Sequence, residues 1–212
     1  MKQYQHIDYF GKNLGHQTIG FEKLDGSNLR FEWNKKRGFY KFGTKNCMMD
    51  ENTEIFGQGI TIFLKKYSEE LDKVFRSKIY RDSLSFVCFA EFIGPNSKFG
   101  QHDPNDKMDM VLFDIDQYKK GFIPPKEFIK SFGHLHIPKV VYEGNLNQIL
   151  YDNVCNNTLE GYEGQLNEGI ICKTVLNNNK FGNLHYCKIK TKTWLDELKA
   201  RYGEERLKEE FI

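Results

Sequence analysis

The chain has 212 residues, of which 39% are hydrophobic and 28% charged, and its formal net charge is +2. This length can form one large domain or two small ones and can bury a substantial core. No apolar run is long enough to cross a membrane, and the N-terminus lacks the apolar stretch of a signal peptide. The composition therefore predicts a globular protein, and its small net charge does not by itself indicate a nucleic-acid partner.

The cysteines predict free thiols rather than disulfides or a zinc site. They are odd in number and none forms a C-x-x-C pair. Their positions are Cys47, Cys88, Cys155, Cys172 and Cys187. We expect most of them to be buried in a protein of a reducing, cytoplasmic compartment.

The first part of the chain predicts a hairpin. Apolar and polar side chains alternate towards the end of the stretch 18–33, which is the period of a half-buried strand. Residues 34–38 predict a turn and residues 39–42 a return strand. Lys23 would then lie just before the hairpin, at the edge of a sheet.

The next elements are a helix and a buried strand. In residues 56–76 the apolar side chains recur every three or four positions, which predicts an amphipathic helix. Residues 84–93 form an apolar run that only Glu91 interrupts. A carboxylate inside such a run is costly unless it is paired or used.

The remaining chain predicts alternating strands and helices joined by polar stretches. We expect strands at 110–115, 137–142, 168–173 and 185–190, helices at 125–132, 145–154 and 193–208, a loop at 94–107 and a turn at 177–183. No repeat or linker is evident, so a single domain of residues 1–212 is the simplest expectation.

Several charged residues lie at or near the ends of the predicted strands. They are Lys23, Asp25, Glu91, Glu168, Lys188 and Lys190. Strand ends from distant parts of a chain often converge on one site. Lysines neutralise phosphate oxygens, carboxylates can hold a divalent metal, and a lysine disfavoured as an ammonium can be a nucleophile. The residues indicate a phosphate-handling site, although each alone could be a solvated charge or a structural ion pair.

Five short stretches occur in a characteristic order along residues 20–192. They are Lys23-Leu24-Asp25-Gly26, Phe89-Ala90-Glu91-Phe92, Val111-Leu112-Phe113-Asp114-Ile115, Glu168-Gly169-Ile170-Ile171-Cys172-Lys173 and Lys188-Ile189-Lys190. Together they resemble motifs I, III, IIIa, IV and V of the covalent nucleotidyltransferases, which include polynucleotide ligases and mRNA capping enzymes.

Asn28 makes the chain most similar to the RNA ligases of the bacteriophage type 2 group. DNA ligases and capping enzymes usually carry arginine at the corresponding position, five residues after the lysine nucleophile. Arg30 would share a face with Asn28 on a regular strand, so it could stand in for that arginine.

The resemblance implies an α+β fold: a nucleotidyltransferase (ATP-grasp-like ligase) domain with mainly antiparallel sheets flanked by helices and no OB domain. It implies ATP as co-substrate together with Mg²⁺ or Mn²⁺. Lys23 would attack the α-phosphate of ATP, release pyrophosphate and form lysyl-AMP. Burial and the neighbouring Lys188 or Lys190 would lower the pKa of Lys23.

The resemblance also assigns roles to other residues. Residues implied to contact the nucleotide are Glu22, Asp25, Gly26, Lys45, Glu91, Phe113, Glu168, Ile170, Lys173, Lys188 and Lys190. Phe113 would stack on the adenine, with Ile170 on its other face. Glu91 would meet the ribose or a hydrated metal ion, Glu168 would bind a metal ion, and Asn28 would act late, on the adenylated polynucleotide end.

The implied activity is an ATP-dependent RNA ligase that seals 5′-phosphate and 3′-hydroxyl ends of RNA or an RNA-containing duplex. Only a short helix is predicted after Lys190, so an accessory protein could replace the C-terminal domain of related ligases. The basic turn Lys35-Lys36-Arg37 could supply some contact to the nucleic-acid backbone.

Four alternatives remain beside this interpretation. The chain could be a minimal ATP-dependent DNA ligase, a GTP-using capping enzyme or a non-catalytic RNA-binding protein with a ligase fold. A kinase-like phosphotransferase is disfavoured because the sequence has no Gly-x-x-x-x-Gly-Lys-Ser/Thr loop.

Overall fold

A computed structural model describes residues 1–95, 105–176 and 184–209 of the chain. The predicted turn at 177–183 lies outside these ranges, as does most of the predicted loop at 94–107. None of the described helices has the length and apolar character that crossing a membrane requires.

The chain forms two compact units, and each is assembled from two separate segments of the sequence. Unit 1 comprises Met1–Gln5 with Asp25–Ile137, and unit 2 comprises His6–Leu24 with Pro138–Ile212. The α+β class with mainly antiparallel sheets is confirmed in both units. The single domain of residues 1–212 stays a prediction.

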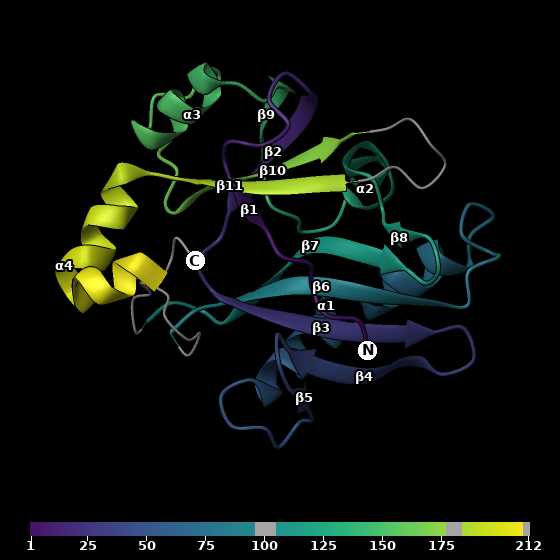
Figure 1. The fold of residues 1–212 in the computed structure, drawn as a ribbon. Helices are drawn as coiled ribbons and strands as arrows, with labels where there is room; N and C mark the ends of the chain where they lie inside the picture. The colour runs from purple at the N-terminus through teal and green to yellow at the C-terminus, as the bar shows by residue number, and fades with distance from the viewer. Residues whose placement is uncertain (96–104, 177–183, 210–212) are drawn as a thin grey trace. The chain divides into compact units, whose positions relative to one another are not determined.

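Unit 1 is built on a six-stranded antiparallel sheet with the strand order β5-β4-β3-β6-β7-β8 (Figure 1). Its strands are β3 (Ser27–Asn34), β4 (Gly38–Thr44), β5 (Met48–Met49), β6 (Ser85–Ile93), β7 (Asp109–Gln117) and β8 (Gly121–Phe122). Its helices are α1 (Gly57–Arg76) and α2 (Pro125–Phe132), which confirms both predicted helices.

One face of this sheet packs against α1. Leu29, Phe31 and Trp33 are fully buried, as their alternation along the sequence predicts. The ring of Phe31 stacks on Phe63 of α1 at a centroid distance of 3.7 Å, and the indole nitrogen of Trp33 donates to Asp72 of α1 at 2.9 Å. These contacts bury the apolar face of the hairpin.

The other face of the sheet carries the polar members of β3 and is partly covered by the first residues of the chain. Tyr4 donates a hydrogen bond to Asp114 at 2.9 Å, and Lys2 forms an ion pair with Asp116. Burial raises the pKa of Asp116, whereas the Lys2 ammonium opposes this shift. The sequence did not predict a role for Lys2 or Tyr4. In the structure, Met1–Gln5 belongs to unit 1.

Unit 2 is built on a five-stranded sheet with the order β1-β11-β10-β2-β9, in which only the β1–β11 pair is parallel among the described strands. Its strands are β1 (Asp8–Tyr9), β2 (Gln17–Lys23), β9 (Val140–Asn145), β10 (Gly169–Val175) and β11 (Leu184–Lys190). Its helices are α3 (Gln148–Cys155) and α4 (Lys192–Glu209), the latter interrupted at Gly203.

Two predicted boundaries in unit 2 are shifted. Strand β9 begins at Val140 rather than at residue 137, and helix α3 begins at Gln148 rather than at residue 145. Asn147 explains the second shift, because its Oδ1 accepts a hydrogen bond from the Leu150 amide at 2.9 Å and caps the helix. Asn145 therefore ends a strand instead of starting a helix.

The apolar core of unit 2 lies between its sheet and α3. It contains Val141, Leu146, Leu150, Val154, Cys155, Leu159, Leu166, Ile170, Cys172, Cys187 and Ile189. All five cysteines are free thiols, and only Cys47 is exposed, as the sequence predicts. This core thus occupies one face of the five-stranded sheet.

Candidate active site

The register of β2, β10 and β11 decides which side chains share the sheet face of unit 2 that lies opposite its apolar core. Directly opposed residues of antiparallel strands project to the same side of a sheet. The successive rows on this face are Lys23 with Gly169 and Lys190, Phe21 with Ile171 and Lys188, and Ile19 with Lys173 and Tyr186. Four lysines from three strands, Lys23, Lys173, Lys188 and Lys190, therefore lie on one face, which we call the lysine-bearing face.

Glu168 joins two of these lysines. Its Oε2 accepts from the Lys23 Nζ at 2.5 Å, and its Oε1 accepts from the Lys190 Nζ at 2.8 Å. Glu168 and Lys190 are 3% and 7% exposed, whereas the Lys23 side chain keeps 22% of its surface in solvent. Charges in so buried a site are stable only when paired, so Glu168 fixes the positions of both ammonium groups.

Three lysines of this face lie over aromatic rings. Lys190 Nζ lies 3.8 Å from the ring centroid of Trp194, and Lys188 Nζ lies 4.1 Å from that of Tyr9. Lys173, only 3% exposed, has its Nζ 4.8 Å from the ring centroid of Phe21. Ring faces attract cations, so these rings help to hold the three ammonium groups in place.

The sequence did not indicate Tyr9 or Trp194 as parts of this site. Tyr9 belongs to the two-residue strand β1, which pairs with β11 near the opposite end of the chain. No local pattern identifies a pairing of that kind. Trp194 lies in the first turn of α4 directly after β11, so the shortness of that connection was the available signal.

The prediction for Ile170 is wrong. Ile170 is opposed to Ile189, is fully buried and belongs to the apolar core. Its neighbour Ile171 shares the lysine-bearing face and is partly exposed. A shift of one residue along a strand moves a side chain to the other face, and the even spacing from Lys173 was the signal that identifies Ile171.

Glu22 also lies on the face opposite to Lys23, because it is opposed to Ile170 in the register. Burial raises the pKa of the Tyr162 hydroxyl, and the Glu22 carboxylate, which accepts a hydrogen bond from this hydroxyl, raises that pKa further. The structure therefore brings Lys23, but not the Glu22 side chain, to the lysine-bearing face. Contact of Glu22 with a nucleotide stays a prediction.

Other predicted site residues lie in unit 1, on the polar face of the six-stranded sheet. Asn28 and Glu91 are directly opposed in the β3–β6 register, and both are half-buried. The Asn28 Oδ1 is buried and accepts no hydrogen bond from the residues that the structure describes. A buried acceptor without a donor is costly, which makes Asn28 a candidate for contact with a ligand.

Phe113 occupies a bulge in β7, where the register with β6 shifts between Phe89 and Ala90. A bulge inserts one extra residue and turns its side chain out of the regular alternation. Phe113 is half-buried, and its ring meets Tyr4 edge-on at a centroid distance of 5.1 Å. Its stacking on a base stays a prediction.

Two further predicted residues of unit 1 have distinct environments. A Cβ on Gly26 would lie 2.5 Å from the Phe92 carbonyl oxygen, so the turn after Asp25 has no room for a side chain. Lys45 is exposed just beyond β4, and nothing in unit 1 assigns it to a site.

Arg30 does not stand in for the arginine of related enzymes. It is 3% exposed, and its guanidinium donates to the carbonyl oxygens of Thr44 at 2.7 Å and Lys2 at 3.0 Å. Burial lowers the pKa of this guanidinium. Its role is to join β4 to the first residues of the chain.

In unit 2, Glu168 is the carboxylate that the sequence predicts as a metal ligand. Within the described ranges, no group of three or more His, Cys, Asp or Glu side chains gathers as metal ligands. Both oxygens of Glu168 accept from lysines. Mg²⁺ commonly binds through one or two carboxylates plus phosphate oxygens and water, and metal binding by Glu91 and Glu168 stays a prediction.

Comparison with known proteins agrees with this arrangement. A family model described as RNA ligase matches residues 17–190. Structures of the RNA ligase from Naegleria gruberi share the fold: those of a variant with AMP and Mn and of the enzyme with PPi each have a TM-score of 0.67 at 15% identity and cover 95% of this chain. A variant with ATP and Mn has a TM-score of 0.62 at 16% identity over 90% of this chain.

This chain covers 59%, 59% and 53% of those three structures, so it spans little more than half of their length. No curated protein matches the chain by sequence. The family match extends over most of the chain and includes the lysine-bearing strands β2, β10 and β11. The chain therefore belongs to the RNA ligase family.

Proposed function

We propose that this chain is an ATP-dependent RNA ligase that seals 5′-phosphate and 3′-hydroxyl ends through a lysyl-AMP intermediate on Lys23. The observation that carries the proposal is the grouping of Lys23, Glu168 and Lys190 on one face of unit 2. Fixed cations placed where charge develops are the main requirement of phosphoryl and nucleotidyl transfer. Family membership and the fold shared with an RNA ligase solved with ATP, AMP and Mn support the proposal.

In the first step the neutral amine of Lys23 attacks the α-phosphorus of ATP. A nitrogen–phosphorus bond forms, the bond to the β-phosphate oxygen breaks, and pyrophosphate leaves with the electron pair. The Glu168 Oε2, 2.5 Å from the Lys23 Nζ, is the nearest acceptor for the amine proton. Lys173, Lys188 and Lys190 stabilise the negative charge of the phosphates. A divalent metal bound with the nucleotide would add further charge neutralisation.

Two steps complete the proposed reaction. AMP passes from Lys23 to the 5′-phosphate of a polynucleotide, and an adjacent 3′-hydroxyl then attacks that phosphate and expels AMP. The open acceptor of Asn28 suits a role in these later steps. Membership of the bacteriophage type 2 group and an accessory protein that completes end joining are part of the same proposal.

We expect Lys23→Ala to abolish covalent labelling by ATP radioactive at the α-phosphate, because the variant lacks the amine that forms the bond to phosphorus. Protein, labelled ATP and Mg²⁺ or Mn²⁺ are incubated and resolved on a denaturing gel. Lys139→Ala, an exposed lysine of the same unit, should label like the unaltered chain. If the unaltered chain takes up no label, and mass spectrometry shows that it carries no AMP beforehand, the proposal is wrong and a non-catalytic RNA-binding protein is favoured.

Two further measurements separate the enzyme alternatives. Labelling by GTP in place of ATP would indicate a capping enzyme. Joining of all-DNA nicks as fast as nicks with ribonucleotides at the 3′-hydroxyl side would indicate a DNA ligase. We expect ATP-specific labelling and a requirement for ribonucleotides.

Replacing each of the two adjacent isoleucines of β10 by alanine should have different effects on stability and on ATP binding. We expect Ile170→Ala to lower the free energy of unfolding by about 2–4 kcal/mol, since it empties a fully buried position. Ile171→Ala should have a smaller effect on stability but raise the KM for ATP, because Ile171 lies on the lysine-bearing face. Chemical denaturation and the ATP dependence of labelling measure the two effects. A raised KM in Ile170→Ala alone would contradict the assignment.

A further inference from the structure

Three turns meet at one end of the six-stranded sheet of unit 1. They are the β3–β4 turn, the segment between α1 and β6, and the β7–β8 turn (Figure 1). The register brings them together, because Asn34 is opposed to Ser85, and Phe86 is opposed to Gln117. The backbone bonds Lys35 N to Leu84 O at 3.0 Å and Tyr118 N to Ser85 O at 3.1 Å join the three segments.

This end of the sheet carries a strong positive charge. Residues 34–41, 76–85 and 117–121 contain nine lysines and arginines and a single acid, Asp82. Their surplus is eight positive charges, whereas the whole chain carries +2, so the rest of the chain is negative by six. The nine cations are all exposed: Lys35, Lys36, Arg37, Lys41, Arg76, Lys78, Arg81, Lys119 and Lys120. We call this set the basic edge.

The acids near the basic edge already have hydrogen-bonding or ion-pair partners. Contacts of this kind are Glu32 with Tyr40 at 2.6 Å, Asp72 with Arg76 at 2.7 Å, Asp82 with Arg81 at 3.8 Å, Glu127 with Tyr80 at 2.9 Å and Asp116 with Lys2. In the part of the chain that the structure describes, Lys36, Lys78 and Lys119 form no ion pair. Their charge is therefore available to a partner.

Aromatic side chains lie among these cations. Tyr118 is 54% exposed, with the Lys119 ammonium 5.5 Å from its ring centroid. Tyr40 lies under Arg37 and Lys41 at 5.4 and 5.3 Å. Cations interleaved with aromatic faces are the composition of surfaces that follow a single-stranded nucleic acid, in which lysines meet phosphates and rings stack on bases.

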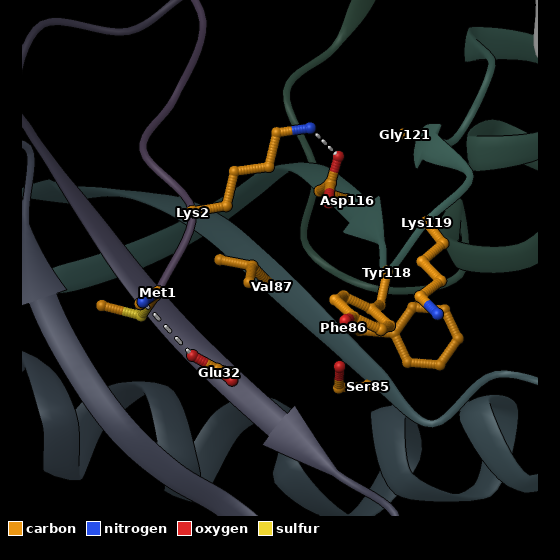
Figure 2. A pocket seen from close by; sticks show the side chains of 10 residues that line it. All are labelled: Met1, Lys2, Glu32, Ser85, Phe86, Val87, Asp116, Tyr118, Lys119 and Gly121. Atoms are coloured by element: carbon orange, nitrogen blue, oxygen red, sulfur yellow. Dashed lines mark hydrogen bonds and ion pairs between the residues drawn. The ribbon is translucent and has the colours of Figure 1, made fainter.

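A pocket of about 390 Å³ opens beside the basic edge, and its size lies within the range of roughly 300–1,000 Å³ of small-ligand sites. Tyr118 and Lys119 lie on one side of it, and Val87 and Phe86 are among its lining residues (Figure 2). The two acids that line the pocket both form ion pairs: Asp116 with the Lys2 ammonium, and Glu32 with the amino group of Met1. Phe86 is fully buried and stacks on Phe75 of α1, so the pocket offers Val87 and the Tyr118 ring beside the Lys119 ammonium.

We propose that the basic edge binds the phosphate backbone of an RNA strand and that Tyr118 stacks on one of its bases at the pocket. This inference rests on the proposed function for the identity of the nucleic acid. It goes further by placing the RNA strand at the end of the sheet where the three turns meet. Asn28 and Glu91 lie towards the opposite ends of β3 and β6.

The test compares two variants that each remove three positive charges from exposed lysines. The edge variant carries Lys36→Gln, Lys78→Gln and Lys119→Gln. The matched control carries Lys12→Gln, Lys65→Gln and Lys139→Gln. Binding of a fluorescent single-stranded RNA of mixed sequence is measured by anisotropy over a range of salt concentrations, and self-labelling by ATP is measured on the same preparations.

We expect the edge variant to bind RNA roughly tenfold or more weakly at low salt, and its salt slope to fall by about 2 for three lost phosphate contacts. The control should keep the slope, and both variants should self-label normally. Tyr118→Ala should weaken binding roughly tenfold, while Tyr118→Phe, which keeps the ring, should not.

Equal RNA binding by the edge and control variants would overturn the proposal. So would an edge variant that loses binding to vesicles of anionic phospholipid but keeps RNA binding, a result that the exposed Ile79 and Leu84 at this edge would then explain. Unchanged binding in Tyr118→Ala would remove the stacking contact. Absence of self-labelling in the unaltered chain would refute the proposed function but leave an edge-dependent RNA affinity intact, so the two failures are distinguishable.

Discussion

We expect Glu168→Gln to slow the formation of lysyl-AMP about 100-fold or more, which is the scale of losing one fixed electrostatic contact in an active site. The amide keeps the shape of the carboxylate but directs an NH₂ group at one of the two lysines. Lys23 and Lys190 would then face each other without the anion that holds them. The free energy of unfolding should fall by about 3 kcal/mol, as expected when one member of a buried ionic group is removed.

The rate of labelling under single-turnover conditions and denaturation by urea test this prediction. Glu163→Gln, an exposed acid five residues earlier, is the matched control and should leave both quantities unchanged. If Glu168 acts through the lysines, additional Mn²⁺ should not restore the rate. Full recovery at high Mn²⁺ would show that Glu168 acts mainly on the metal.

Gly169→Ala should disrupt the same site through the backbone. Gly169 has a φ of +147°, and a Cβ there would lie 2.0 Å from the Ile189 carbonyl oxygen. Backbone strain and overpacking each cost about 1–3 kcal/mol, so we expect a total loss of about 3–5 kcal/mol in unfolding free energy. Relief of the clash must move β10 away from β11, which separates Glu168 from Lys190 and should also abolish labelling.

Gly161→Ala provides the control for strain alone. Gly161 also has a positive φ, +77°, but a Cβ there would meet nothing within 4 Å. We expect a loss of about 1 kcal/mol and unchanged labelling. Thermal unfolding of both variants, with labelling on the same samples, checks the comparison. A Gly169→Ala protein as stable as Gly161→Ala would contradict the close approach of β10 and β11 at this residue.

The sequence was sufficient to predict the elements that have a strong local signal. The alternation of Leu29, Phe31 and Trp33 and the apolar period of α1 are set by burial on one face, and both are confirmed. The order of the charged motifs likewise predicted that Lys23 and Glu168 come together, which their 2.5 Å contact shows.

Features that depend on long-range pairing could not be predicted in the same way. Ile170 and Ile171 are equivalent in composition, and only the register with β2 and β11 tells which of them faces the lysines. Arg30 has a suitable position in the sequence for an anion-binding residue. In the structure, however, its guanidinium donates to the carbonyl oxygens of Thr44 and Lys2. Such partners have no counterpart in the local pattern.

The central position of β2 in its sheet has a consequence for synthesis of the protein. β2 ends at Lys23, but its two neighbours, β9 and β10, begin over a hundred residues later. The six-stranded sheet pairs strands from a nearly continuous segment, and such local pairings form early. A growing chain can thus complete that sheet while Lys23 still lacks Glu168 and Lys190. Adenylation of Lys23 would accordingly mark only chains whose synthesis has passed β11.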